Sequence, residues 1–291
     1  MIIKLRGADF SADNIGTVST DLNLLDYTKA AILASGNETM DDYQKLALDS
    51  FFRSLGAGEN DGIITKMRKI YLPIICNDVT KGLINYADEN FTDDGPLSSS
   101  VWSLRNRGLV GSATTPAINE TLSNPLLATN FSVFWLRTER MVSGTNDSQY
   151  VAVFRGKTNT NLWCGPTEVS ASSNSMVSWG QYGTNWSTNT VKSSITAVKT
   201  AALICRGAND VDRNIYGVWD STLSGLTLAD FSNESSESLY VLGLGSNNQL
   251  KPYAVVMVGE AVTLEQGKAI SSAIDAMWDV FKPSTPEVPG E

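Results

Sequence analysis

The sequence predicts a mainly β protein: an antiparallel β-sandwich with an N-terminal helical segment and a C-terminal capping helix. Only 18% of its residues are charged, and polar turn-forming residues take the place of the missing charges. Short apolar runs of period two fill the centre, whereas helical periodicity is confined to the two ends. We therefore divide the chain into an arm at 1–20, a helical lead-in at 21–95, a sandwich at 96–282 and a flexible tail at 283–291.

The arm is expected to form a short strand and a turn-rich stretch within Ile2–Val18. In the lead-in, Thr39 is a candidate N-cap, with Asp42 three residues further on. One apolar stripe at helical spacing follows: Leu48, Phe51, Phe52 and Leu55. The glycines at 56 and 58 should end this helix.

A second short helix is expected to begin near Asn60 or Asp61 and to end before Pro73. Its apolar residues would be Ile63, Ile64, Met67 and Ile70. Neither helix can bury its stripe alone, so each must pack on the other or on the β-domain.

The sandwich is predicted from apolar runs that are separated by clusters of Gly, Asn, Asp and Ser. The candidate strands are Ser132–Thr138, Tyr150–Phe154, Met176–Trp179, Ala197–Cys205, Ile215–Trp219, Leu239–Leu244 and Ala254–Val258. Strands at this spacing without intervening helices favour a sandwich or jelly roll. Five tryptophans are assigned to its core: Trp102, Trp135, Trp163, Trp219 and Trp278.

A strong helix should close the domain. Thr263 and Gln266 form a capping box, and Pro283 ends the helix. The apolar stripe consists of Ile270, Ile274, Met277, Trp278 and Phe281. The proline-rich tail that follows has no means of forming a core.

Composition excludes several classes of function. The net charge of −9 and the scattered basic residues argue against a nucleic-acid partner. The absence of histidine excludes catalytic sites that need one. The three cysteines form no metal-binding spacing and indicate buried free thiols in a reducing compartment. No leader or apolar segment of spanning length is seen, so synthesis in the cytoplasm without membrane insertion is expected.

Two segments resemble a known group of proteins. Gly62–Pro73, GIITKMRKIYLP, resembles the segment that precedes jelly-roll domains in phage and prophage virion proteins. Tyr253–Gly267, YAVVMVGEAVTLEQG, resembles the last strand and following helix of laminin-G-like (concanavalin A-like) domains. Lys4–Gly16 looks like the start of Bacteroides-type phage proteins. The chain departs from the phage pattern at Ile74–Asp78, where a G-G-T-A sequence is usual, which puts the subfamily in doubt.

The resemblance implies a virion structural protein, such as a fibre or decoration subunit, that acts by binding. Its N-terminal part would dock onto other virion proteins, and its sandwich would meet a host-surface glycan or a neighbouring subunit. A homo-oligomer is expected, because multivalency multiplies weak affinity. The alternatives are a stand-alone carbohydrate-binding lectin and a glycan-degrading enzyme.

Catalytic carboxylates are not evident in the sequence. Glycoside hydrolases of this fold carry alternating acidic residues on one strand, so that the carboxylates share a face. No such triplet occurs, and Glu139, Glu168, Asp220 and Glu260 stand singly. Carboxylates from distant strands could still converge, but a non-enzyme without cofactor is the favoured prediction.

Asp210, Asp212 and Asn214 place oxygen-bearing side chains at alternate positions, as a calcium loop does. An EF-hand is excluded, because the glycine and glutamate that it requires are absent. A Ca²⁺ site at the sandwich edge stays open beside the favoured interpretation, a polar hairpin turn.

The richest candidate for ligand binding lies in Trp179–Trp186, WGQYGTNW. Aromatic rings can stack on sugar rings, while amides and hydroxyls bind sugar hydroxyl groups. A glycine-hinged loop would bring Trp179, Gln181, Tyr182, Asn185 and Trp186 together. The favoured alternative is that Trp179 ends a core strand and that Trp186 closes one end of the sandwich.

Overall fold

The computed structural model describes residues 22–95, 102–105, 107–111, 118–122, 130–138, 152–156, 161–167, 176–182, 191–192, 198–207, 210–215, 217–220, 237–241 and 252–284. The predicted N-terminal arm lies outside the described residues, as does nearly all of the predicted tail. Among the helices that are described, none is long and apolar enough to cross a membrane.

The described strands form two antiparallel sheets. The first is eight-stranded, in the order β12-β11-β10-β5-β14-β3-β2, and β1 also pairs with β14. Its strands are β1 (Met67–Tyr71), β2 (Trp102–Arg105), β3 (Gly108–Gly111), β5 (Phe131–Arg137), β10 (Thr200–Gly207), β11 (Asp210–Ile215), β12 (Val218–Asp220) and β14 (Tyr253–Gly259).

The second sheet is six-stranded, in the order β4-β13-β6-β7-β8-β9. Its strands are β4 (Ile118–Leu122), β6 (Ala152–Gly156), β7 (Asn161–Thr167), β8 (Met176–Tyr182), β9 (Val191–Lys192) and β13 (Glu237–Val241). All of its strand pairs are antiparallel.

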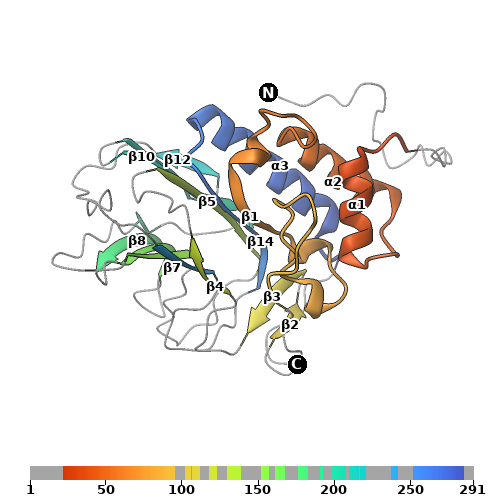
Figure 1. Ribbon diagram of the computed structural model, residues 1–291, viewed down its shortest axis with the longest axis horizontal. Helices are drawn as coiled ribbons and strands as arrows, with labels where there is room; N and C mark the ends of the chain where they lie inside the picture. The colour runs from red at the N-terminus through yellow and green to blue at the C-terminus, as the bar shows by residue number, and fades with distance from the viewer. Residues whose placement is uncertain are drawn as a thin grey trace.

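The central strands of the eight-stranded sheet are covered on both faces. Every residue of β5 and β14 is buried, although alternate residues of a strand belong to opposite faces. On one face Phe134, Leu136 and Met257 join the core beneath the helices, and on the other Val133 and Trp135 are buried too. Figure 1 shows the six-stranded sheet on the side away from α3. The molecule is therefore a β-sandwich with a helical layer on one sheet, and the predicted fold class is confirmed.

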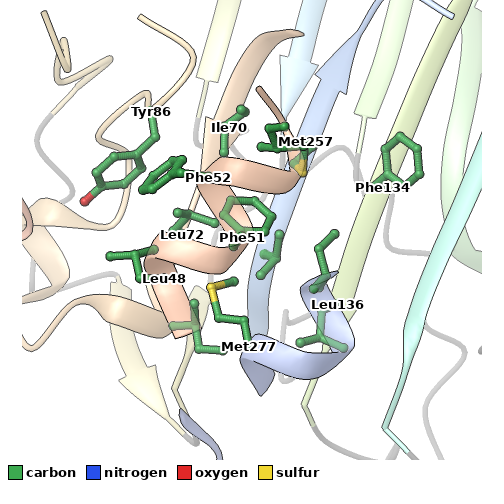
Figure 2. Packing of buried hydrophobic residues seen from close by; sticks show 14 of the residues in the cluster. Leu48, Phe51, Phe52, Ile70, Leu72, Tyr86, Phe134, Leu136, Met257 and Met277 are labelled. Atoms are coloured by element: carbon green, nitrogen blue, oxygen red, sulfur yellow. The ribbon is translucent and has the colours of Figure 1, made fainter. Parts of the chain in front are cut away.

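The helical layer consists of α1 (Asp26–Ser35), α2 (Asp42–Ser54) and α3 (Leu264–Phe281). Figure 2 shows the α2 side chains Leu48, Phe51 and Phe52 among residues of β1, β14 and α3. The predicted α2 stripe is thus confirmed. Short 3₁₀ turns connect the lead-in: η1 (Ile63–Lys66), η2 (Pro73–Ile75) and η3 (Val79–Lys81).

The predicted N-cap of α2 is wrong by two residues. Asp41 is the cap: its side chain accepts from the backbone N–H of Gln44 at 2.8 Å, and the Gln44 side chain accepts from the Asp41 N–H at 3.2 Å. The hydroxyl of Thr39 instead donates to Oδ1 of Asn37 at 3.0 Å. A reciprocal capping box satisfies two helix-end groups, and it fixes the start of α2 at Asp42.

The predicted second helix is wrong beyond Lys66. Only the η1 turn forms, and the chain then enters β1, whose Ile70 pairs with Met257 of β14. The side chain of Asn85 accepts from the Ile70 N–H at 3.0 Å and donates to the Arg68 carbonyl at 3.0 Å, so it occupies the outer edge of β1. These partners come from distant parts of the chain, and they override the local helical spacing.

Several strand predictions also need correction. The candidate Ile215–Trp219 spans a turn at Gly217, whose N–H donates to Oδ1 of Asn214 at 2.7 Å and whose φ is 95°. Strands β2, β3, β4, β7 and β9 were not predicted at all. In β7 the pair Gly165-Pro166 resembles a turn in sequence, yet both residues pair with β8.

The C-terminal helix is confirmed with its capping box. The Thr263 hydroxyl accepts from the Gln266 N–H at 3.2 Å, and the helix ends at Phe281, before Pro283. All five predicted stripe residues are buried. At Gly267 an added Cβ would lie 2.4 Å from Ile204 Cδ1, so α3 approaches β10 closely at this glycine.

Candidate binding surface

The predicted ligand loop is largely a strand. Trp179, Gln181 and Tyr182 belong to β8, which continues to Tyr182 and pairs with β7 along its whole length. The prediction that β8 stops at Trp179 is therefore wrong. Gly180 resembles a hinge in the sequence, but it lies inside the strand and pairs with Trp163. Asn185 and Trp186 lie outside the described residues.

Strand alternation separates the candidate residues. Successive residues of a strand belong to opposite faces of the sheet. Trp179 and Gln181 consequently share one face of the six-stranded sheet, and Tyr182 belongs to the other. The backbone thus does not bring these three residues to a single surface.

The face that contains Trp179 is mainly apolar. Following the cross-strand partners from Trp179 gives Cys164 on β7, Ala152 on β6, Val241 on β13 and Ile118 on β4. The neighbouring row runs from Gln181 through Leu162, Phe154 and Leu239 to Glu120, so its three central positions are apolar. An antiparallel sheet with one apolar face packs that face against a core. We call this set the apolar face, and it is the natural partner of the covered inner face of the eight-stranded sheet.

The opposite face combines aromatic and polar residues, and we call it the polar face. One cross-strand row runs from Gly180 through Trp163 and Val153 to Tyr240 and Asn119. The next row contains Tyr182, Asn161, Arg155, Ser238 and Thr121. Three aromatic residues are thereby interspersed with amide, hydroxyl and guanidinium groups.

Spacing on the polar face suits an extended ligand. Neighbouring strands lie about 4.8 Å apart, so Trp163 on β7 and Tyr240 on β13 are separated by about 10 Å across β6. Tyr182 on β8 lies one strand beyond Trp163. The three aromatic residues therefore extend across four neighbouring strands.

Strand register also changes the interpretation of Trp163. The sequence assigned it to the core, but alternation places it on the polar face with Asn161 and Arg155. For Trp135 and Trp278 the core assignment is confirmed, and Trp219 packs partly buried against the same core. The described side chains do not include that of Trp102.

The candidate calcium ligands lie on β11, so the interpretation of Asp210–Asn214 as a hairpin turn is wrong. Arg206 donates to Asp210 Oδ1 at 2.7 Å and also to Asp212, and its hydrogen bonds lower the pKa of Asp210. Asn214 donates to the Ser271 hydroxyl of α3 at 3.2 Å.

A guanidinium group therefore occupies the position that a cation would need between the two carboxylates. Among the side chains that the structure describes, no group of three or more His, Cys, Asp or Glu residues is arranged to hold a metal ion.

Other carboxylates on the helical side tie elements together. Asp49 accepts from the Thr28 hydroxyl and the Leu25 N–H, each at 2.7 Å. Asp94 accepts from Lys69 at 2.8 Å and from the Tyr71 hydroxyl at 2.5 Å. These contacts are structural, since each joins segments that lie far apart in the sequence.

Comparisons with known proteins do not assign this chain to a family. Neither the protein-family models nor the curated proteins yield a match to this sequence. Among solved structures the chain is similar to domain 4 of AbnA, a GH43 extracellular arabinanase from Geobacillus stearothermophilus, solved in complex with arabinotriose. The identity is 14%, the TM-score is 0.45, and the match covers 71% of this chain and 98% of that one. We draw no functional conclusion from a likeness at this level.

Proposed function

We propose that this protein is a non-enzymatic glycan-binding module of a bacteriophage virion and that it binds through the polar face. The observation that carries the binding proposal is the division of the six-stranded sheet into an apolar face and a face with Trp163, Tyr182 and Tyr240. Aromatic residues on a solvent-side face are costly unless a partner covers them. Amide and hydroxyl groups beside them supply the hydrogen bonds that orient a sugar.

Binding would take place on a surface formed by paired strands. The first predicted site depended on loop residues, whereas Trp163 and Tyr240 are fixed by ladder pairing with β6. A preorganised surface loses less conformational entropy on binding than a loop does. Gln181 and Trp179 then serve the sandwich interior.

The virion role is supported by the sequence resemblance of Gly62–Pro73 to the segment that precedes jelly-roll domains in phage virion proteins. Tyr253–Gly267, which resembles laminin-G-like domains, supports the sandwich that such a protein would present. Repetition in a homo-oligomer would give weak single sites the avidity that host attachment needs. The protein would then act as part of the virion particle, and neighbouring virion proteins would be the partners of its N-terminal part.

Binding is tested with Trp163→Ala and Tyr240→Ala on an array of bacterial surface glycans. We expect the wild-type protein to bind and each variant to lose at least about tenfold in affinity, because aromatic anchors dominate such surfaces. Tyr43→Ala is the matched control, since Tyr43 is an exposed residue of α2, on the helical layer. Equal binding by all four proteins would place the site elsewhere.

The virion role is tested by mass spectrometry and electron microscopy of purified particles of the parent phage. Presence at a symmetric, stoichiometric position supports it. If the protein is absent from particles that bind the same glycan, the virion role is wrong and the alternative of a stand-alone lectin is favoured. Release of reducing ends from a bound glycan would contradict the proposal that the protein is not an enzyme.

A further inference from the structure

The charged residues of the described strands in the six-stranded sheet are divided between its faces by sign. Arg155 on β6 and Lys192 on β9 belong to the polar face. Glu120 on β4 and Glu237 on β13 belong to the apolar face. Within these strands the polar face therefore carries two cations and no carboxylate.

This local excess of positive charge contrasts with the chain as a whole, whose net charge is −9. Overall electrostatics repel an anion at long range, so only a local arrangement can favour one. Within a Debye length of about 8 Å at physiological salt, nearby charges outweigh distant ones. A face with two cations is complementary to an acidic ligand.

Arg155 occupies the centre of the polar face. It pairs across the sheet with Asn161 of β7 and Ser238 of β13. Trp163 and Tyr240 are the next residues along those two strands on the same face. Val153 of β6 pairs with both Trp163 and Tyr240, so Arg155 is placed one row away from these two aromatic positions, diagonally across from each.

From this juxtaposition we propose that the polar face binds an acidic glycan and that Arg155 recognises a uronate carboxylate. Arginine matches the planar carboxylate in a bidentate way, and such charge-assisted hydrogen bonds are stronger than neutral ones. Trp163 and Tyr240, in the neighbouring row of the same face, would hold the sugar rings next to the acidic group. Lys192, three strands from Arg155, would meet an acidic group further along an extended chain.

This inference rests on the proposed function, because it requires that the polar face bind glycan. The experiment measures binding of the full chain to polygalacturonate, alginate and hyaluronate by titration calorimetry. Each polysaccharide is compared with its carboxyl-reduced form, which keeps the sugar backbone and removes the charge. Arg155→Gln is tested beside Arg68→Gln, which removes an exposed arginine of β1 in the other sheet.

We expect at least one uronate polymer to bind and to lose about tenfold or more in affinity on carboxyl reduction or in Arg155→Gln. Arg68→Gln should bind like the wild type. Added salt should weaken binding of the acidic form more than that of the reduced form. Circular dichroism of Arg155→Gln checks that the sandwich is retained, and Arg155→Lys should restore part of the affinity through its charge alone.

The remaining outcomes separate the two proposals. If acidic and reduced forms bind equally and Arg155→Gln has no effect, the recognition of uronate is wrong while glycan binding stands. If Trp163→Ala abolishes binding of a neutral glycan that Arg155→Gln leaves intact, the face binds neutral sugars and the inference is overturned. If no glycan of any charge binds, both proposals fail.

Discussion

Trp163 and Trp179 show that the role of a single residue depends on which face of the sheet it belongs to. The sequence assigned Trp163 to the core, whereas Trp179 was a candidate ligand-binding residue beside the favoured interpretation that it ends a core strand. Pairing of β7 with β8 puts Trp163 opposite Gly180 and Trp179 opposite Cys164. Strand alternation therefore places Trp163 on the polar face and Trp179 on the apolar face, and only the prediction for Trp163 changes.

Asp275 of α3 links this helix to Thr200 of β10 in the eight-stranded sheet. It accepts hydrogen bonds from the Thr200 N–H at 2.7 Å and the Thr200 hydroxyl at 2.8 Å. Desolvation by burial raises its pKa above the ordinary 3.8, and nearby Asp279 adds to the increase, whereas Thr200 and Lys199 oppose it. The folded protein consequently favours the protonated carboxyl.

The sign of the pH effect follows from this raised pKa. Protonated Asp275 contributes fully to the stability of the fold below pH 3.8, the ordinary pKa of the group. This contribution is lost as the pH rises through the higher pKa of the group in the folded protein. Asp275→Asn cannot ionise and keeps an oxygen for the Thr200 N–H. We expect its stability relative to the wild type to increase from pH 3 to pH 7 in urea denaturation. A relative gain of the wild type over that range would contradict the assignment.

At the scale of elements, a buried carboxylate joins the first two helices. Asp49 of α2 accepts from the N–H of Leu25, the N-cap residue of α1, and from the hydroxyl of Thr28. The Arg53 guanidinium also donates to Asp49, at 2.5 Å. The apolar periodicity of α1 is weak, so its position depends strongly on these polar contacts.

Removal of this carboxylate should loosen α1. We expect Asp49→Ala to lower the free energy of unfolding by about 2–3 kcal/mol, because it leaves the buried Thr28 hydroxyl and the partly buried Leu25 N–H without their acceptor. Half-exposed Arg53 adds little. Asp42→Ala, which breaks a more exposed pair with Lys45, should cost under about 1 kcal/mol. Urea denaturation compares the two, and equal losses would show that Asp49 does not anchor α1.

At the scale of the whole molecule, the lead-in and the sandwich share one hydrophobic core. That cluster contains Phe51 and Phe52 of α2, Phe134 of β5, Met257 of β14 and Met277 of α3. Figure 2 shows how α2 and α3 cover the sheet at this point. The helices therefore complete the fold that supports the polar face on the far sheet.

A chain that begins at residue 96 should not fold on its own. It would retain α3 but would expose the sheet face that α2 covers in the full chain, and it would leave the part of β14 that pairs with β1 without its partner strand. We expect aggregation or a molten state, whereas the full chain should unfold in one cooperative transition. Thermal unfolding followed by circular dichroism compares the two. A soluble fragment with its own sharp transition would mean that the sandwich is independent.

Features that depend on neighbouring residues could be predicted from the sequence. The β-rich composition and turn clusters predicted the sandwich, and Thr263 with Gln266 predicted the start of α3. A capping box and an amphipathic stripe are local, so a single stretch of chain contains all the information. The positions of β5, β10 and β14 were predicted for the same reason.

Features that depend on distant partners became visible only in the folded chain. Met67–Tyr71 is a strand because β14 and Asn85 supply its hydrogen-bonding partners, although its spacing also fits a helix. The face of Trp163, Arg155 and Tyr240 follows from the register of β7, β6 and β13, whose order in the sheet is not their order in the chain. Register is a property of pairs of strands, and no single segment encodes it.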